Sequence, residues 1–184
     1  AKVSHVTIDN FSAAYKAVRH LTEIGHRRIG MISCDNSFLS TIQRESGYRK
    51  ALKDSGIEFD PLLVKLGNYG FRSGIRAAKM LFSLDRRPTA IFAISDVMAI
   101  GAIRAAREEG LKVPEDVAVM GFDDISFASM CEPLLSTVSQ PKYDLGCTAM
   151  ELLLRKIRGE LTGPEDIILE HEIVIRESTV GVNI

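Results

Sequence analysis

The sequence predicts an α/β protein with a doubly wound, mostly parallel sheet. Short apolar runs alternate with amphipathic stretches through the first two thirds of the chain. The run Ala90–Ile94 contains no polar residue, which is typical of a parallel strand that is covered on both faces. Strict alternation of strands and helices implies right-handed crossovers between parallel strands.

The spacing of apolar side chains predicts each element in turn. Val3–Ile8 reads as a strand, and Phe11, Ala14, Val18 and Leu21 then recur at helical spacing until Gly25 stops the helix. The next elements follow the same rhythm: strand 29–32, helix 44–55, strand 63–66, helix 72–84, strand 90–94, helix 97–109 and strand 117–120. Asp96 stands where a helix N-cap is expected.

The rhythm breaks after residue 124. Residues 125–133 show no clear period, 136–139 fit one strand, 144–158 fit a helix and 167–175 fit one or two strands. We find no internal repeat, low-complexity tract or long linker in the sequence.

Composition excludes several classes of function. Of 184 residues, 46% are hydrophobic, which is sufficient for a substantial core. The net charge is −1, so the sequence shows no excess of the basic residues that a nucleic-acid-binding surface requires. No apolar run approaches the length of about 20 residues that spans a bilayer. Cys34, Cys131 and Cys147 match no zinc or redox spacing, so we expect reduced, buried thiols in a cytoplasmic protein. The first residues contain neither a signal peptide nor an initiator Met, so the chain reads as a cut through a longer protein.

Motifs of enzymes do not occur in the sequence. Its four histidines, His5, His20, His26 and His171, are scattered and fit no metal-ligand spacing. G-x-S-x-G, P-loop and G-x-G-x-x-G motifs are also missing. We therefore predict no catalytic residue, no cofactor and no metal site.

Polar and aromatic residues follow the ends of successive predicted strands, where ligands bind in open parallel sheets. This set is Asp9, Asn10, Ser33–Asn36, Phe38–Arg44, Asn68, Tyr69, Ser95, Asp96, Asp123, Asp124 and Gln140. Carboxylates and an Arg can hold adjacent hydroxyl groups, and aromatic rings can pack on a sugar or a base. The set predicts a polyhydroxylated or heterocyclic ligand. Alternatively, Asp9 and Asp96 only cap helices and Asp124 only stabilises a turn.

Five segments in order resemble the lactose/galactose repressor family of bacterial transcription regulators. They are residues 8–29 (IDN, then HLTEIGHRRI), 44–48 (RESGY), 87–102 (RPTAIF, then SDVMAIGA), 113–124 (VPEDV, then GFDD) and 133–141 (PLLSTVSQP). Family members have a DNA-binding helix-turn-helix and a two-lobed effector domain like periplasmic sugar-binding proteins. The resemblance implies that residues 10–133 and 165–184 form the C-terminal lobe. Residues 1–9 and 134–164 would be remnants of the N-terminal lobe, and the helix-turn-helix is absent.

The resemblance also implies site residues. The positions that match the family's effector contacts are Asp9, Phe38, Ser40, Arg44, Tyr69, Ser95, Asp123 and Gln140. Two departures are that Ser33–Asn36 replaces a common Gly-Pro and that Ser95 replaces a common Asn. The positions that match the family's dimer interface are Ile100, Arg104, Phe127, Met130 and Cys131. The alternative for these apolar residues is that they close the core.

The implied function is the ligand-sensing and dimerisation part of a cytoplasmic transcriptional repressor. A sugar-like or nucleobase-like effector would bind between the lobes and modulate DNA binding, with operator DNA contacted only through the absent N-terminal domain and no membrane involved. The residues identify neither the effector nor whether it induces or co-represses. The alternative is a periplasmic sugar-binding protein of a transporter, which would carry an export signal and be a monomer.

Overall fold

The computed structural model describes residues 3–35 and 38–180. Its central element is a four-stranded sheet in the order β3-β2-β4-β5, and all three strand pairs are parallel. These strands are β2 (Ile29–Ser33), β3 (Val64–Leu66), β4 (Ala90–Ala93) and β5 (Ala118–Met120). Every residue of β2, β4 and β5 is buried, as expected for strands covered on both faces.

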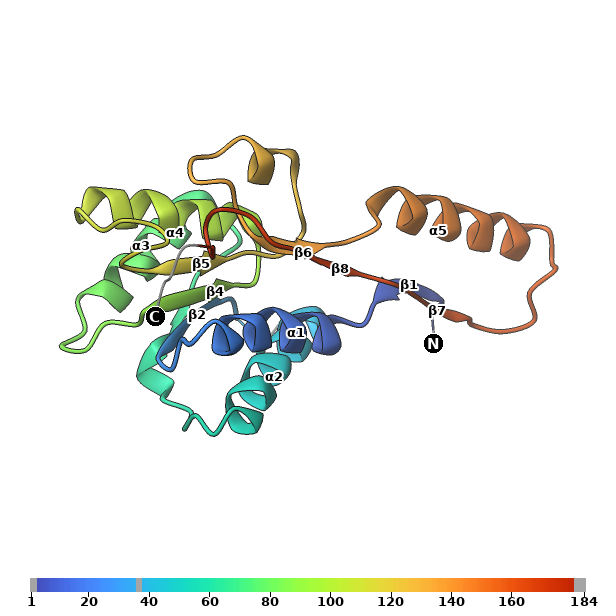
Figure 1. Ribbon diagram of the computed structural model, residues 1–184. Coiled ribbons are helices and arrows are strands. Elements are labelled where there is room, and N and C mark those ends of the chain that lie inside the picture. Colours follow the sequence, from blue (N-terminus) through green and yellow to red (C-terminus); the bar gives the residue numbers. More distant parts are fainter. Residues whose placement is uncertain (1–2, 36–37, 181–184) are drawn as a thin grey trace.

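Helices cover both faces of this sheet. Helices α1 (Asn10–Glu23) and α2 (Leu39–Asp54) pack together on one face, and α3 (Phe71–Phe82) and α4 (Asp96–Glu108) pack together on the other (Figure 1). A Cβ atom at Gly74 of α3 would collide with the carbonyl oxygen of Met98 in α4. Glycine at this position therefore lets the two helices approach closely. The parallel sheet and its helices confirm the predicted doubly wound α/β fold.

The remaining strands lead away from this sheet. Strand β6 (Thr137–Ser139) runs antiparallel to β8 (Glu172–Val174), and single bridges join residues Ser136 and Ser139 to the end of β5 and the loop after it. Strand β1 (His5–Ile8) pairs in parallel with β7 (Asp166–Leu169), and α5 (Lys142–Ile157) packs against β1. Short 3-10 helices occupy Pro61–Leu63 (η1) and Ser126–Ser129 (η2).

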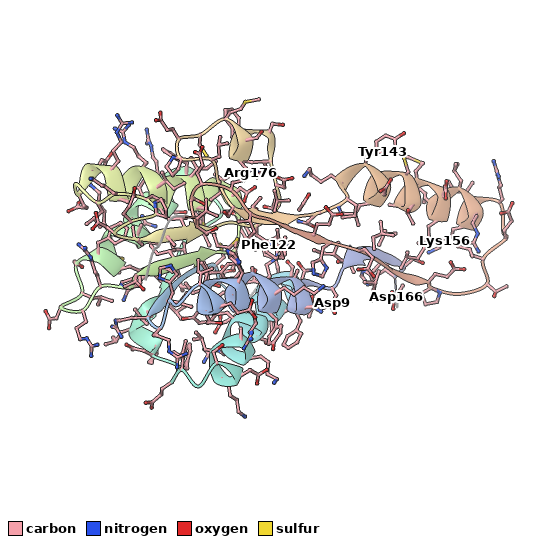
Figure 2. The ribbon with its side chains drawn as sticks, viewed as in Figure 1. Asp9, Phe122, Tyr143, Lys156, Asp166 and Arg176 are labelled. Carbon is pink, nitrogen blue, oxygen red and sulfur yellow. The ribbon has the colours of Figure 1, made fainter. Side chains whose placement is uncertain are left out.

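Figure 1 shows β1, β7 and α5 standing well apart from the four-stranded sheet. We call residues 3–8 and 142–169 the arm, and the other described residues the body. The chain passes between body and arm next to Asp9, before Lys142 and after Leu169. In Figure 2, Asp9 lies at the base of the arm, whereas Tyr143, Lys156 and Asp166 lie on it.

Several expected boundaries were wrong. Helix α2 begins at Leu39 and not at Arg44; the apolar residues near its start, Leu39 and Ile42, are 70% and 43% exposed and do not lie on the face that the helix buries. The N-cap of α4 is Ser95 and not Asp96. The expected strand or strands over 167–175 are two strands that belong to different sheets.

The structure also groups two segments differently from the predicted lobes. β7 was expected in the C-terminal lobe with residues 165–184, but it pairs with β1 in the arm. β6 was expected with the other lobe, but it pairs with β8 and extends the body. Residues 1–2 and 181–184 of the predicted lobes lie outside the described residues.

Cys34 is buried, Cys131 is half-buried and Cys147 is exposed, all as free thiols, so the expectation of buried thiols is confirmed for Cys34, holds in part for Cys131 and was wrong for Cys147. Within residues 3–35 and 38–180, no helix has both the length and the apolar character needed to cross a membrane.

Candidate functional site

Arg44 occupies the centre of the candidate site. It projects from α2, and its side chain is nearly buried against the ends of neighbouring elements. Its Nε donates to Asn10 Oδ1 at 2.9 Å, and its Nη1 donates to the carbonyl oxygen of Ile94 at 2.6 Å. The guanidinium carbon lies 3.6 Å from the centroid of the Phe122 ring. Burial lowers the pKa of Arg44, while Asp123 and Asp96 oppose this shift. These contacts fix the direction of the guanidinium.

Asp123 faces Arg44 from the loop after β5. Its Oδ1 lies 3.7 Å from Arg44 Nη1 and accepts a hydrogen bond of 2.7 Å from Gln140 Nε2. Burial raises the pKa of the Asp123 carboxyl, and the charge of Arg44 is the largest opposing effect. Arg44, Asp123 and Gln140 are separated in sequence and were all predicted at the site, and the fold brings them together.

The loop that carries Asp123 is fastened from several sides. Asp123 and Asp124 have φ angles of 116° and 53°, a region that residues other than glycine rarely adopt. Lys142 Nζ donates to the carbonyl oxygens of both residues at 2.8 Å. Arg176 Nη2 donates to Asp124 Oδ1, also at 2.8 Å. These contacts hold a backbone shape that is unfavourable by itself.

Aromatic rings lie on another side of the site. Tyr69, after β3, has a φ of 62°, and its hydroxyl is 2.7 Å from Thr41 Oγ1 in α2. The ring of Phe38 meets the ring of Tyr69 edge-on, with centroids 6.3 Å apart. Phe38 is 58% exposed, so an apolar face is open to a ligand.

Ser95 and Asp96 lie beneath the site at the start of α4. Ser95 Oγ accepts from the backbone N–H of Met98 at 3.4 Å and so caps the helix. The Asp96 carboxylate is fully buried, where Oδ1 accepts from Thr137 Oγ1 at 2.6 Å and Oδ2 accepts from the N–H of Ile125 at 2.8 Å. Burial raises the pKa of Asp96 to about 6.

Two predicted residues stand apart from these contacts. Asp9 is exposed and accepts from the N–H of Ser12 at 2.9 Å, so its observed role is to cap α1. Ser40 lies in the first turn of α2, half-buried. Asn36, which belongs to the loop that departs from the family pattern, lies outside the described residues.

Asn10 belonged to the predicted strand-end set but not to the positions matched to the family's effector contacts, and Lys142 belonged to neither. Asn10 is buried, and besides accepting from Arg44 it donates from Nδ2 to the carbonyl oxygen of Ile8 at 3.3 Å. It followed a predicted strand end in the sequence, so a signal was present. Lys142 follows Gln140-Pro141 closely, but its partners are backbone carbonyl groups that no sequence pattern reveals.

A second candidate surface lies on α4 and the 3-10 helix η2. Phe127 and Met130 are 67% and 72% exposed, so they do not close the core, which was the alternative for them. Together with Ile100 and Cys131 they line a hollow of about 370 Å³. Arg104 lies on the same helix as Ile100 and pairs with Glu108 at 2.8 Å. The surface is an apolar patch with a charged border.

Comparison with known proteins agrees with this geometry. A family model described as a periplasmic binding protein-like domain matches residues 18–179. The repressor CytR of Escherichia coli is 42% identical over 174 residues, which are 95% of this chain and 51% of that protein. The regulator CelR of Thermobifida fusca is 41% identical over 179 residues, which are 96% of this chain and 52% of that protein. The chain thus spans about half the length of the curated relatives it matches.

Solved structures agree closely as well. The CelR–cellobiose complex superposes with a TM-score of 0.92 and 40% identity, covering 96% of this chain and 54% of that one. CcpA of Lactococcus lactis superposes with a TM-score of 0.91 and 34% identity, covering 97% of this chain and 65% of that one.

The fold thus defines a domain of the periplasmic-binding-protein type. The chain belongs to the family of periplasmic-binding-protein-like domains, in the branch formed by regulators of the lactose/galactose repressor family.

Proposed function

We propose that this chain is the effector-sensing and dimerising part of a cytoplasmic transcription repressor, and not an enzyme. The observation that carries the proposal is the meeting of Arg44, Asp123 and Gln140 near the exposed ring of Phe38 and the partly buried ring of Tyr69. Charged groups in fixed positions bind adjacent hydroxyl or amide groups, and the rings pack on a flat apolar face. A sugar-like or nucleobase-like effector fits this set.

The exposed apolar surface of the arm favours an effector site that lies between two lobes. Its exposed apolar side chains include Leu153, Leu154 and Ile157 of α5 and Ile168 of β7. A two-stranded sheet with one helix is too small to bury these faces by itself. We propose that the arm belongs to the N-terminal lobe, whose remaining part is supplied by another region of the intact gene product. The effector would then lie between that lobe and the body.

The apolar patch around Phe127 and Met130 is the proposed dimer interface. Contiguous exposed apolar surface with a charged border is typical of protein–protein contacts. The patch includes Ile100 of α4, and the N-cap of this helix, Ser95, directly follows Ile94, whose carbonyl oxygen accepts from Arg44. A change at the effector site could therefore reach the partner subunit, and through it operator DNA, which we assign to a separate DNA-binding domain.

The comparisons support a regulator over a transporter component, because the curated relatives CytR and CelR are transcriptional regulators. A ligand can shift the orientation of the lobes only if it binds the two orientations with different affinity. The proposal therefore predicts that the effector binds one lobe orientation more tightly than the other.

Isothermal titration calorimetry of the intact gene product tests the proposed function. The probes are cellobiose, D-ribose, adenine, uracil and the four ribonucleosides, which cover the sugar and nucleobase classes. We expect at least one probe to bind. Arg44→Ala should weaken its binding by about 1.5–3 kcal/mol, the range for hydrogen bonds to a charged group. The control Asp85→Asn, on an exposed turn, should bind like the wild type. Equal affinity of Arg44→Ala and wild type would refute the site.

A further inference from the structure

We infer that Lys142 is a positioning residue for Asp123, the residue whose carboxylate contacts the effector in the proposed function. Its ammonium group joins the arm to the loop that carries Asp123 and holds this loop in the shape that presents the carboxylate. The inference rests on the proposed function, because it assigns Asp123 a role in effector binding. It goes beyond the proposed function because it assigns control of Asp123, a residue of the body, to the ammonium group of a residue in the arm.

The first support is the coincidence of strained backbone and donated hydrogen bonds. Asp123 and Asp124 both have positive φ angles, and Lys142 Nζ donates to the carbonyl oxygen of each at 2.8 Å. Strained conformations persist only where surrounding contacts hold them. One ammonium group that bonds two successive carbonyl oxygens restrains the peptide planes on both sides of Asp124. Hydrogen bonds from a charged donor are stronger than those from a neutral one.

The second support is where the contacts of this loop originate. Asp96 accepts from the N–H of Ile125, and Arg176 donates to Asp124; both of these side chains belong to the body. Lys142 is the first residue of α5 and therefore of the arm. Of these three side chains, Lys142 is the one that belongs to the arm.

A mechanical consequence follows from this arrangement. A change in the orientation of the arm that moves the start of α5 away from this loop stretches or breaks the bonds of Lys142, and so alters the loop of Asp123. Linkage makes the effect reciprocal, so a ligand held by Asp123 favours the orientation in which Lys142 keeps its two bonds. Lys142 would thereby couple effector binding to lobe orientation.

The competing interpretation is an exposed lysine that makes incidental surface contacts. Such contacts often contribute nothing measurable. The two interpretations differ in what happens to the loop, and only to the loop, when the ammonium group is removed.

Hydrogen exchange measured by mass spectrometry on the ligand-free, intact gene product separates them. We compare the wild type with Lys142→Met, Lys142→Arg and the control Lys53→Met, which removes an exposed lysine from the end of α2. In Lys142→Met, peptides covering 121–126 should exchange at least about threefold faster while the strands of the body stay unchanged. Lys142→Arg should restore part of the protection, and Lys53→Met should match the wild type. Unchanged exchange over 121–126 in Lys142→Met would overturn the inference.

A double-mutant cycle with Asp123→Asn tests the role in binding. The ligand is whichever of cellobiose, D-ribose, adenine, uracil and the four ribonucleosides binds the wild type most tightly. Lys142→Met should weaken binding by about threefold to tenfold in the wild-type background and hardly further in Asp123→Asn. Fully additive losses would show that Lys142 acts without Asp123, and would also overturn the inference.

Failure of the proposed function gives a different result. If none of these probes binds the wild type, the effector-binding proposal fails, and the effector role of Asp123 fails with it. The exchange experiment then still decides whether Lys142 holds the loop, because it uses no ligand.

Discussion

Replacing Asp96 by Asn should remove a pH-dependent penalty from the stability of the protein. The Asp96 carboxylate has no exposed surface and lies between Thr137 Oγ1 and the N–H of Ile125. Burial raises its pKa from the ordinary value of 3.8 to about 6, and the charges of Asp123 and Asp124 act in the same direction. The hydrogen bonds from Thr137 and Ile125 oppose the shift and do not overcome it.

The sign and size of the effect follow from linkage. At pH values well below 3.8 the carboxyl group is protonated in both the folded and the unfolded chain. As the pH rises through about 6, the folded chain must ionise a buried group that the unfolded chain has already ionised in water, so stability is lost. A shift of about two pKa units corresponds to about 3 kcal/mol. Roughly half of this should develop between about pH 5 and about pH 7.5.

An asparagine fits the same place without this penalty. Its Oδ1 can accept from the N–H of Ile125 and its Nδ2 can donate to Thr137 Oγ1, whose hydroxyl can turn toward the carbonyl oxygen of Val138, now 3.5 Å away. The free energy of unfolding of Asp96→Asn should therefore rise relative to that of the wild type by about 1.5 kcal/mol between these two pH values.

Urea unfolding followed by circular dichroism at a series of pH values measures this difference. Asp85→Asn, which changes an exposed carboxylate, is the control and should run parallel to the wild type. If the difference between Asp96→Asn and the wild type were constant over the pH range, the reasoning from burial would be refuted.

Three further predictions concern packing, the aromatic side of the site and the apolar patch. Gly74→Ala should destabilise the protein by about 1–3 kcal/mol because the new Cβ meets the backbone of α4. Gly146→Ala, in open space on α5, should stabilise the protein by about 0.5–1 kcal/mol. Urea unfolding in which both variants change stability in the same direction would contradict this. Tyr69→Phe should lower stability by about 0.5–1.5 kcal/mol by leaving the buried Thr41 hydroxyl without its 2.7 Å partner, and a loss no larger than the error of the unfolding curves would argue against that bond. Phe127→Asp combined with Met130→Asp should shift sedimentation velocity toward monomer, because both apolar side chains are exposed on the proposed interface; Leu62→Asp, on an exposed residue of η1, is the control, and a dimer that persists in the double variant would place the interface elsewhere.

The alternating pattern of the sequence was sufficient to predict most of the fold. The uninterrupted apolar run Ala90–Ile94 predicted a covered strand, and β4 is buried throughout. The pattern failed where burial did not follow it. Near its start, α2 exposes the apolar Leu39 and Ile42 and buries the polar Thr41 instead, so apolar spacing did not mark the face that the helix buries.

The site was predicted where chemistry and strand order coincide, as for Arg44 and Asp123. It could not be predicted where the role depends on a distant partner. Ser95 and Asp96 are both good capping residues, and only contacts with Thr137 and Ile125 decide that Asp96 is buried and Ser95 caps the helix. The role of Lys142 could not be predicted for the same reason, because its partners are carbonyl groups on another loop.

The parallel pairing of β1 with β7 has a consequence for biosynthesis. It joins residues about 160 positions apart, from His5 to Asp166, whereas the four-stranded sheet is complete by residue 120. A growing chain can thus pair β2 to β5 while β7 has not yet been made, and contacts between distant positions form slowly. Until then the edge of β1 that pairs with β7 lacks this partner, so the pairing waits for a segment that is synthesised much later, and chaperones or aggregation compete for that edge during the interval.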